Sequence, residues 1–389
     1  MKICFIGSVY PRSHEDSEVP WLRKTVNLLR EAGHNVAVYV PSFRGLRSHE
    51  IDGCPVKRFR YFFARWETLT HDEGAPNKIH RFHYKFIMVF YFFFGTVGLI
   101  RFHRREKFDI LHVHWPAPHA LFAFFASMVC KTKIVLSFYT ASLMLVKRFP
   151  FVKYLLRFFI RRADRVIAIS TFTKNLVKDI YDCPITIIPY GTTISPKSEV
   201  PPLVPNRKIL SVGRMIERKG FRYLIHAMPM VLNEWPDASL TIVGGGPVRE
   251  DLIALCKSLG IEKQVSLPGK IPQEALEQLF AECNVFVLPS IVDKRGDTEG
   301  LGVVLIEAMT YHRPVIGTDI GGIVDIVINN ETGLLVRQRD PQALADAIDA
   351  IFSDPENAKR MAENGYHHAQ SQFSWQSVIK KFDAVYSSL

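Results

Sequence analysis

Two glutamates, Glu299 and Glu307, are separated by seven residues in the segment TEGLGVVLIEAM. Each carboxylate can accept hydrogen bonds from a pair of hydroxyl groups, so the two could hold a sugar and a ribose. Between them, Gly300, Leu301 and Gly302 precede a predicted helix, whose first N–H groups and positive dipole end favour an anion. The glycines would let the backbone approach that anion closely. An amphipathic helix with two solvated acids is the plain alternative.

A pair of cations follows a predicted strand in the segment KILSVGRMIERKGF. Arg214 and Lys219 lie five residues apart, and Gly213 provides the turn at the end of the strand. Two cations at a strand end can bracket a diphosphate and neutralise charge on a leaving nucleoside diphosphate in a transition state. Either residue alone could equally be an ordinary surface cation.

Glycines also end two further predicted strands. Gly244 and Gly245 follow SLTIV, and Gly269, Lys270 and Ile271 follow QVSLP. Such loops permit close backbone approach to a phosphate, a nucleoside or the edge of a base, although each is also compatible with a plain tight turn. The sequence contains neither GxGxxG nor a P-loop, so dinucleotide and ATP-type sites lose their main motif.

Short apolar segments alternate with longer helical patterns along the whole chain. Strands that are apolar throughout predict parallel sheets covered on both faces, and the alternation predicts an α/β protein of two doubly wound, Rossmann-like domains. The predicted strands are KICFIGS, NVAVYVP, ILHVHW, KIVLSFY, RVIAIS and ITIIPYG, and then KILSVGR, SLTIVGGG, QVSLPG, VFVLPS, PVIGTD and GLLV.

A proline-rich segment without periodicity, residues 193–207, separates these two series and predicts a linker. Residues 1–192 would then form an N-terminal domain and residues 208–368 a C-terminal domain. Residues 369–389 predict a C-terminal helix that packs back across the domain junction. Ligands of doubly wound sheets bind at the carboxyl ends of the strands, so we expect the domains to face each other across a cleft.

Composition and charge are those of a globular protein with one basic half. The 389 residues are 48% hydrophobic and 22% charged, and no apolar run reaches the roughly 20 residues of a spanning helix. The N-terminus lacks a signal-peptide pattern, and six scattered cysteines without CxxC favour a reducing cytoplasm and argue against zinc. Residues 1–195 carry 29 Lys and Arg against 14 Asp and Glu, whereas the remainder carries 20 against 24.

The C-terminal half contains an ordered series of motifs: VGRxxxxKG, VGGGP, LPGK, PS…EGLGxxxxEAM and RPVIGTDIGG. In this series it resembles the family-four retaining glycosyltransferases of the GT-B fold (glycosyl transferases group 1). The likeness is strong over roughly residues 205–340. It implies a nucleotide-diphospho-sugar donor in the C-terminal domain and three catalytic residues: Arg214 and Lys219 on the diphosphate, and Glu299 on the sugar. It further implies that Glu307 binds the ribose.

The same resemblance places the remaining donor-binding positions. The amides of Gly300–Gly302 would face the sugar or phosphate, and Gly269–Ile271 would border the base. It implies no metal ion and no cofactor, because the two cations stand in for a metal.

The N-terminal half matches this family less closely. The family often has a His after the fifth strand, in a phrase like FHGxD, where this chain has SFYTAS, with Tyr139 in place of the His and Ser142 in place of the acid. His114, Tyr139 and His14 are therefore the candidate acceptor-side residues, although a lone strand histidine is more often structural.

The basic half predicts an anionic partner. The run FIMVFYFFFGTVGLI at residues 86–100 is flanked by basic residues and predicts either a helix buried against the sheet or an interfacial helix at a bilayer. The segment FVKYLLRFFIRR aligns Lys153, Arg157 and Arg161 in a cationic stripe, where each cation near anionic lipid contributes ~1 kcal/mol. Nucleic-acid binding is not expected, because no recognisable motif accompanies the charge.

The sequence therefore predicts a retaining, metal-independent glycosyltransferase that moves a hexosyl group from a UDP- or GDP-sugar to a glycan or lipid-linked acceptor. We expect a cytoplasmic protein, peripheral on the inner face of the membrane. The alternatives are a sugar-nucleotide-binding or scaffold protein of the same fold with impaired catalysis, and a related epimerase or phosphorylase.

Overall fold

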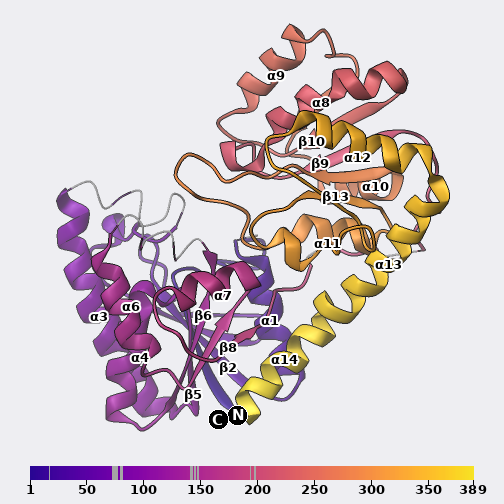
Figure 1. The fold of residues 1–389 in the computed structure, drawn as a ribbon. Helices are drawn as coiled ribbons and strands as arrows, with labels where there is room; N and C mark the ends of the chain where they lie inside the picture. The colour runs from indigo at the N-terminus through magenta and orange to yellow at the C-terminus, as the bar shows by residue number, and fades with distance from the viewer. Residues whose placement is uncertain are drawn as a thin grey trace. The chain divides into compact units, whose positions relative to one another are not determined.

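The chain forms two compact α/β units in a computed structural model (Figure 1). The structure describes residues 1–16, 18–71, 78, 82–140, 143, 146, 149–192, 194–196 and 199–389, so Ser142 lies outside the described residues. The N-terminal unit comprises Met1–Tyr190 and Val378–Leu389, and the C-terminal unit comprises Gly191–Ser377. The described residues between Gly191 and Arg207 form neither helix nor strand.

The N-terminal unit is built on a sheet of eight described strands in the order β3-β4-β2-β1-β5-β6-β7-β8. All neighbours are parallel except β3 and β4, which form an antiparallel hairpin at one edge. The strands are β1 (Lys2–Ile6), β2 (Asn35–Pro41), β3 (His49–Ile51), β4 (Cys54–Phe59), β5 (Ile110–His114), β6 (Lys133–Phe138), β7 (Arg165–Ala168) and β8 (Ile185–Ile187). The helices are α1 (Pro20–Glu31), η1 (Ala64–Trp66), α3 (Phe82–Glu106), α4 (Pro116–Val129), α6 (Phe151–Ile160) and α7 (Thr171–Lys178).

The C-terminal unit holds a parallel sheet of six described strands in the order β11-β10-β9-β12-β13-β14. Its strands are β9 (Lys208–Val212), β10 (Ser239–Val243), β11 (Val265–Gly269), β12 (Val285–Leu288), β13 (Val315–Thr318) and β14 (Leu334–Val336). Its helices are η2 (Glu217–Lys219), α8 (Phe221–Glu234), α9 (Arg249–Ser258), α10 (Gln273–Glu282), α11 (Val303–Thr310), η3 (Ile323–Asp325), α12 (Pro341–Ser353) and α13 (Pro355–Phe373). This confirms the prediction of two doubly wound domains.

The tail is broken where the sequence predicted one helix over residues 369–389. Residues up to Phe373 belong to α13, and a separate helix, α14 (Trp375–Ser387), begins after Ser374. Within the N-terminal unit, α14 brings Tyr386 to His112 of β5, with 2.8 Å between the tyrosine hydroxyl and Nδ1. Packing of the tail across the domain junction stays a prediction.

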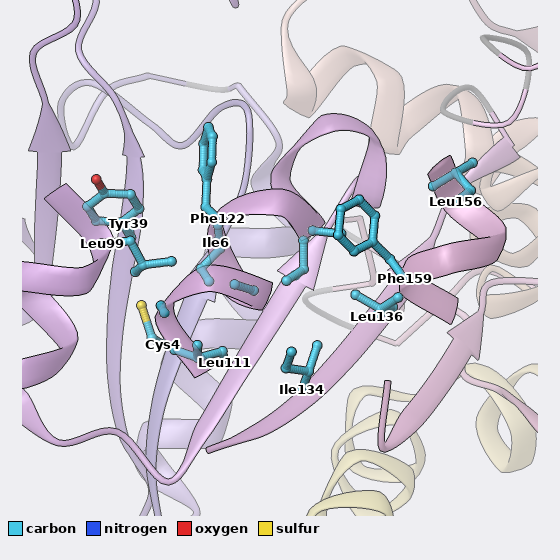
Figure 2. Close-up of a cluster of buried hydrophobic side chains, with 14 of the residues drawn as sticks. Cys4, Ile6, Tyr39, Leu99, Leu111, Phe122, Ile134, Leu136, Leu156 and Phe159 are labelled. Carbon is cyan, nitrogen blue, oxygen red and sulfur yellow. The ribbon is translucent and has the colours of Figure 1, made fainter. Parts of the chain in front are cut away.

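A single layer of helices covers one face of the N-terminal sheet. Figure 2 shows Leu99 of α3, Phe122 of α4 and Phe159 of α6 directed at strand residues that include Ile6 and Leu136. The apolar run at residues 86–100 is thus part of a helix packed on the sheet, and the Tyr39 hydroxyl donates a 2.8 Å hydrogen bond to the carbonyl of Gly95. Burial of these side chains removes apolar surface from water and holds the layer in place.

Candidate functional site

The candidate donor residues follow β9 and β12, the two central strands of the C-terminal sheet. The strand order reverses direction between these strands, which pair through Val285 with Ile209 and Phe286 with Leu210. In doubly wound sheets, ligands bind outside the carboxyl ends of the strands at such a reversal. Arg214 and Lys219 leave β9 at this point, and Glu299 lies on the loop that leaves β12.

Lys219 and Glu299 form a buried ion pair, although they lie 80 positions apart in the sequence. The Lys219 ammonium lies 2.6 Å from Glu299 Oε2. Arg218 approaches the same oxygen at 3.4 Å, and the Ser290 hydroxyl donates to it at 3.3 Å. Glu299 Oε1 makes no hydrogen bond with any other described residue, so it is available to a hydroxyl of a ligand.

The charged partners keep Glu299 ionised. Burial disfavours the charged form most strongly, but the charges of Lys219 and Arg218, with hydrogen bonds from Lys219 and Ser290, outweigh it and lower the pKa of Glu299 below its usual range. A carboxylate that stays ionised is an acceptor of hydrogen bonds and cannot donate a proton. Glu299 is therefore suited to accepting hydrogen bonds from hydroxyl groups and to stabilising positive charge.

Arg214 differs from Lys219 in its surroundings. Its side chain is exposed, and among the described residues no acid pairs with it. An exposed guanidinium at the end of β9 keeps all its donors for an anionic ligand.

The glycines predicted at three strand ends converge in one row. The Gly213 amide donates to the Val243 carbonyl at 2.9 Å, and the Gly244 amide donates to the Gly269 carbonyl at 2.9 Å. Gly244 has a φ of +138°, and a Cβ there would overlap the Gly213 carbonyl, so only glycine fits. Lys270 is exposed beside Gly245, with its Cγ 3.8 Å from where a Cβ on Gly245 would stand, and half-buried Ile271 follows.

The predicted helix start after Gly300 and Leu301 is present. Gly302, with a φ of +96°, is the N-cap of α11, and Leu301 is buried. Glu307 lies on the second turn of α11 and is only 5% exposed, so it is not a solvated surface acid. The Leu305 amide donates back to the Gly302 carbonyl at 2.9 Å, and the first amides of an α-helix point out of its N-terminus.

Arg218 is a site residue that the sequence argument missed. It bridges Glu299 and Asp297, with 3.6 Å between its Nε and Asp297 Oδ2. Its position next to Lys219 in the segment ERKG is the only signal in the sequence. Among the described residues, no cluster of three or more His, Cys, Asp and Glu side chains is arranged to hold a metal ion. The predicted independence of metal stays a prediction.

On the N-terminal unit, the structure joins two of the three candidate acceptor-side residues. His114 ends β5 and Tyr139 follows β6, and 2.7 Å separates the histidine Nδ1 from the tyrosine hydroxyl. Burial lowers the pKa of His114 to about 3, so the ring is neutral at pH 7. The rings of Trp21 and Trp115 lie 5.0 Å and 5.1 Å from that of Tyr139, which makes an aromatic cluster that the sequence argument did not foresee.

The third candidate, His14, has different neighbours. Its side chain is largely exposed in the loop after β1, and its Nδ1 lies 3.2 Å from Asp52 Oδ1. No described contact joins His14 to His114. His112, which also lies on β5, is held by Ser137 at 2.7 Å and by Tyr386 at 2.8 Å, which is the arrangement of a structural histidine.

Replacing Tyr139 by phenylalanine should destabilise the N-terminal unit without affecting the donor site. His114 Nε2 already lacks a hydrogen-bond partner, so loss of the tyrosine hydroxyl removes the last bond of a buried ring. We expect the free energy of unfolding to fall by about 1–3 kcal/mol. Thermal melting measures this, with the exposed Tyr154→Phe as the control. A melting temperature equal to that of the unaltered chain would contradict the argument.

Comparisons with known proteins identify the class of enzyme. The family model described as Glycosyl transferases group 1 matches residues 197–368, and the model described as Glycosyltransferase Family 4 matches residues 22–195. The chain belongs to the family-four glycosyltransferases of the GT-B fold.

Named relatives agree with this class. The chain is 28% identical over 296 residues to the N-acetyl-alpha-D-glucosaminyl L-malate synthase of Bacillus anthracis, covering 73% of this chain and 75% of that protein. It is 34% identical over 170 residues to a GDP-mannose-dependent alpha-(1-6)-phosphatidylinositol monomannoside mannosyltransferase of Mycolicibacterium smegmatis. That second match spans 43% of this chain and 44% of the relative, less than half of each.

Among solved structures, Anabaena HepE in complex with UDP matches all of this chain and all of that chain, with a TM-score of 0.74 and 18% identity. At this identity the likeness concerns the fold alone. Together the family models and the named relatives show that the protein is a glycosyltransferase.

Proposed function

We propose that the enzyme transfers a hexosyl group, with retention of anomeric configuration, from a UDP- or GDP-sugar to a glycan or lipid-linked acceptor. The proposal requires no metal ion and no cofactor. It places the reaction at the cytoplasmic surface of the membrane.

The observation that carries the proposal is the buried Lys219–Glu299 pair at the reversal of strand order, with exposed Arg214 on the same loop. Lys219 and Arg214 supply two positive charges for the diphosphate of the donor. Glu299 holds the Lys219 ammonium through Oε2 and offers Oε1 to a hydroxyl of the sugar. The glycine row at Gly213, Gly244 and Gly269 lets the nucleotide approach the backbone.

In the proposed step, the bond between the anomeric carbon and the diphosphate oxygen breaks, and its electron pair leaves with the diphosphate. The acceptor hydroxyl bonds to the anomeric carbon on the same face. Its proton passes to the departing diphosphate oxygen, so no protein base is needed. Cations placed where negative charge develops lower the barrier to such a step.

The properties of His114 are consistent with that route. A buried imidazole with a pKa of about 3 is a weak base, and its Nδ1 is engaged by Tyr139. A general base works best when its pKa lies near the working pH. Tyr139, in the place of the family's usual histidine, is thus compatible with catalysis.

Relatives support the proposed substrates. The mycobacterial relative is named for GDP-mannose and for a phosphatidylinositol mannoside, and the HepE structure holds UDP. These names favour a nucleotide-diphosphate donor and a lipid-linked acceptor. The alternative of a scaffold with impaired catalysis is not favoured, because Arg214, Lys219, Glu299 and Glu307 are all present and three of them are placed for chemistry.

A panel of nucleotide sugars tests the proposal. A donor that binds the folded enzyme raises its melting temperature. The size of this increase should therefore show whether the enzyme prefers UDP-hexoses or GDP-hexoses. The stabilising donor should then release UDP or GDP slowly when no acceptor is present. Absence of both a thermal shift and nucleotide release across the panel would contradict the proposal.

Replacing Glu307 by alanine should chiefly weaken donor binding. Its proposed partner is the ribose, which takes no part in bond breaking, so we expect KM for the donor to rise about tenfold with a smaller change in kcat. Initial-rate kinetics of nucleotide release measure both constants. Thr310→Ala, one turn further along α11, is the matched control for disturbance of the helix. An unchanged KM would remove the ribose role.

A further inference from the structure

Helix α3 has one buried face and one exposed aromatic face. Tyr84, Ile87, Tyr91, Leu99 and Phe102 are buried in the core of the N-terminal unit. On the opposite side, Phe82, Phe86, Val89 and Phe93 are between 56% and 84% exposed. Their spacing of four, three and four residues places them in one stripe along the helix.

Neighbouring elements extend this stripe. Phe62 contacts Phe86 and Phe90 of α3 and also Phe63, which is 70% exposed. Phe151 and Tyr154 of α6 are 66% and 76% exposed, and Met128 of α4 is 69% exposed. Because α3, α4 and α6 form one layer on the sheet, their exposed sides belong to the outer surface of that layer (Figure 1). We call these exposed apolar side chains of α3, α4 and α6, with Phe63, the aromatic face.

Positive charge accompanies the aromatic face, and negative charge is nearly absent from it. Of the four Lys and Arg of α3, Lys85 lies within the stripe, and Arg101, Arg104 and Arg105 lie in the last two turns of the helix, beyond Phe93. Helix α6 adds Lys153 and Arg157, and the only acid of α3, α4 and α6 is Glu106 at the end of α3. Glu106 is already paired, with Lys2 at 2.9 Å and with Arg105 at 2.8 Å. Lys85 and Lys153 are exposed beside the phenylalanines.

We propose that the aromatic face binds the surface of an anionic lipid bilayer. Exposed aromatic and aliphatic side chains enter the boundary between headgroups and acyl chains, while the surrounding lysines and arginines bind lipid phosphates. Many exposed apolar side chains on one layer of helices mark an interaction site, and the scarcity of carboxylates fits a negative partner. The inference deepens the membrane location in the proposed function and depends on none of the donor-site residues.

The protein lies on the bilayer and does not cross it through this helix. Among the described residues, α3 alone is long and apolar enough to span a membrane. The apolar run at residues 86–100 is too short to do so, but the helix that contains it has 25 residues. A spanning α3 would have to leave the core, expose Tyr91 and Leu99, and break the hydrogen bond between Tyr39 and Gly95. The buried side of α3 therefore stays on the sheet, and only its outer stripe meets lipid.

Vesicle co-sedimentation of the full chain tests the inference. We expect binding to vesicles of phosphatidylcholine mixed with phosphatidylglycerol at low salt, and much weaker binding to phosphatidylcholine alone. The double variant Phe86→Ser/Phe93→Ser should weaken partitioning by about tenfold or more, because two rings no longer leave water on binding. Lys85→Gln/Lys153→Gln should weaken binding to the anionic vesicles only.

The control is Val204→Ser/Ile328→Ser, which removes two exposed apolar side chains of the C-terminal unit and should bind as the unaltered chain does. Phe151→Ser/Tyr154→Ser on α6 tests the same face independently, and melting temperatures show that each variant folds. Equal vesicle binding by the α3 and α6 variants and the unaltered chain would overturn the inference. A second outcome would also overturn it: the unaltered chain does not bind vesicles but forms a dimer without lipid, and Phe86→Ser/Phe93→Ser dissociates that dimer.

Nucleotide release from the donor separates this inference from the proposed function. Phe86→Ser/Phe93→Ser should release UDP or GDP at the unaltered rate in the absence of vesicles. A chain that binds anionic vesicles but releases no nucleotide would contradict the proposed function and support the aromatic face as a membrane-binding surface.

Discussion

Lys219→Ala should reduce transfer by about 100-fold or more, because it removes a positioned positive charge from the departing diphosphate. The same change leaves the buried carboxylate of Glu299 with Arg218 as its remaining cation, at 3.4 Å. Turnover with a saturating donor measures the loss. Arg218 should not compensate, since it already bridges Asp297 and Glu299.

Lys257→Ala is the matched control, because it removes an exposed lysine from α9 of the same unit. Its turnover should equal that of the unaltered chain. Melting curves show whether Lys219→Ala remains folded at the assay temperature. A folded Lys219→Ala variant with normal turnover would contradict the role of Lys219 on the diphosphate.

Glu299→Gln should also lower turnover by about 100-fold, although glutamine keeps the size of the side chain. The substitution removes the negative charge that pairs with Lys219 and faces the sugar. The buried ammonium of Lys219 then loses the carboxylate that lies 2.6 Å away in the unaltered chain. The effects of Lys219→Ala and Glu299→Gln should not add in the double variant, since each single change breaks the same pair. Glu250→Gln, an exposed acid on α9, is the control. Additive losses would indicate that the two residues act separately.

The lowered pKa of Glu299 also predicts a dependence of stability on pH. A carboxylate whose pKa is lower in the folded state stabilises the fold above the unfolded pKa of about 4.3, and this contribution disappears as the pH falls through the folded pKa. The difference in melting temperature between the unaltered chain and Glu299→Gln should therefore be largest near neutral pH. It should shrink at pH values below about 4. A difference that is constant across this range would contradict the assignment.

The strands were predictable because uniformly apolar segments of the right length stand between turn residues. All twelve predicted strands occur in the described residues, whereas β3 and β4 were missed. Their turn is Asp52–Gly53, with both φ values positive, at +52° and +72°, as in a tight two-residue hairpin. The signal was thus present in the sequence. The strand itself is hard to recognise because β4 buries a charged residue, Arg58, which donates to the carbonyls of Tyr10 and Pro11.

The candidate site was predictable in its parts and not in its connections. Strand-end positions are local features, so Arg214, Lys219 and the glycine row could be placed from the sequence. The contact between Lys219 and Glu299 depends on the pairing of β9 with β12, which no local pattern reports. For the same reason, the sequence grouped His14 with His114, whereas the fold pairs His14 with Asp52.

The most direct test of the account is a crystal structure of the enzyme with the nucleotide sugar that stabilises it most. We expect the diphosphate within hydrogen-bonding distance of Arg214 and Lys219, and a hydroxyl of the sugar on the carboxylate of Glu299. A donor bound at any other part of the chain, with Arg214, Lys219 and Glu299 free of ligand, would contradict it.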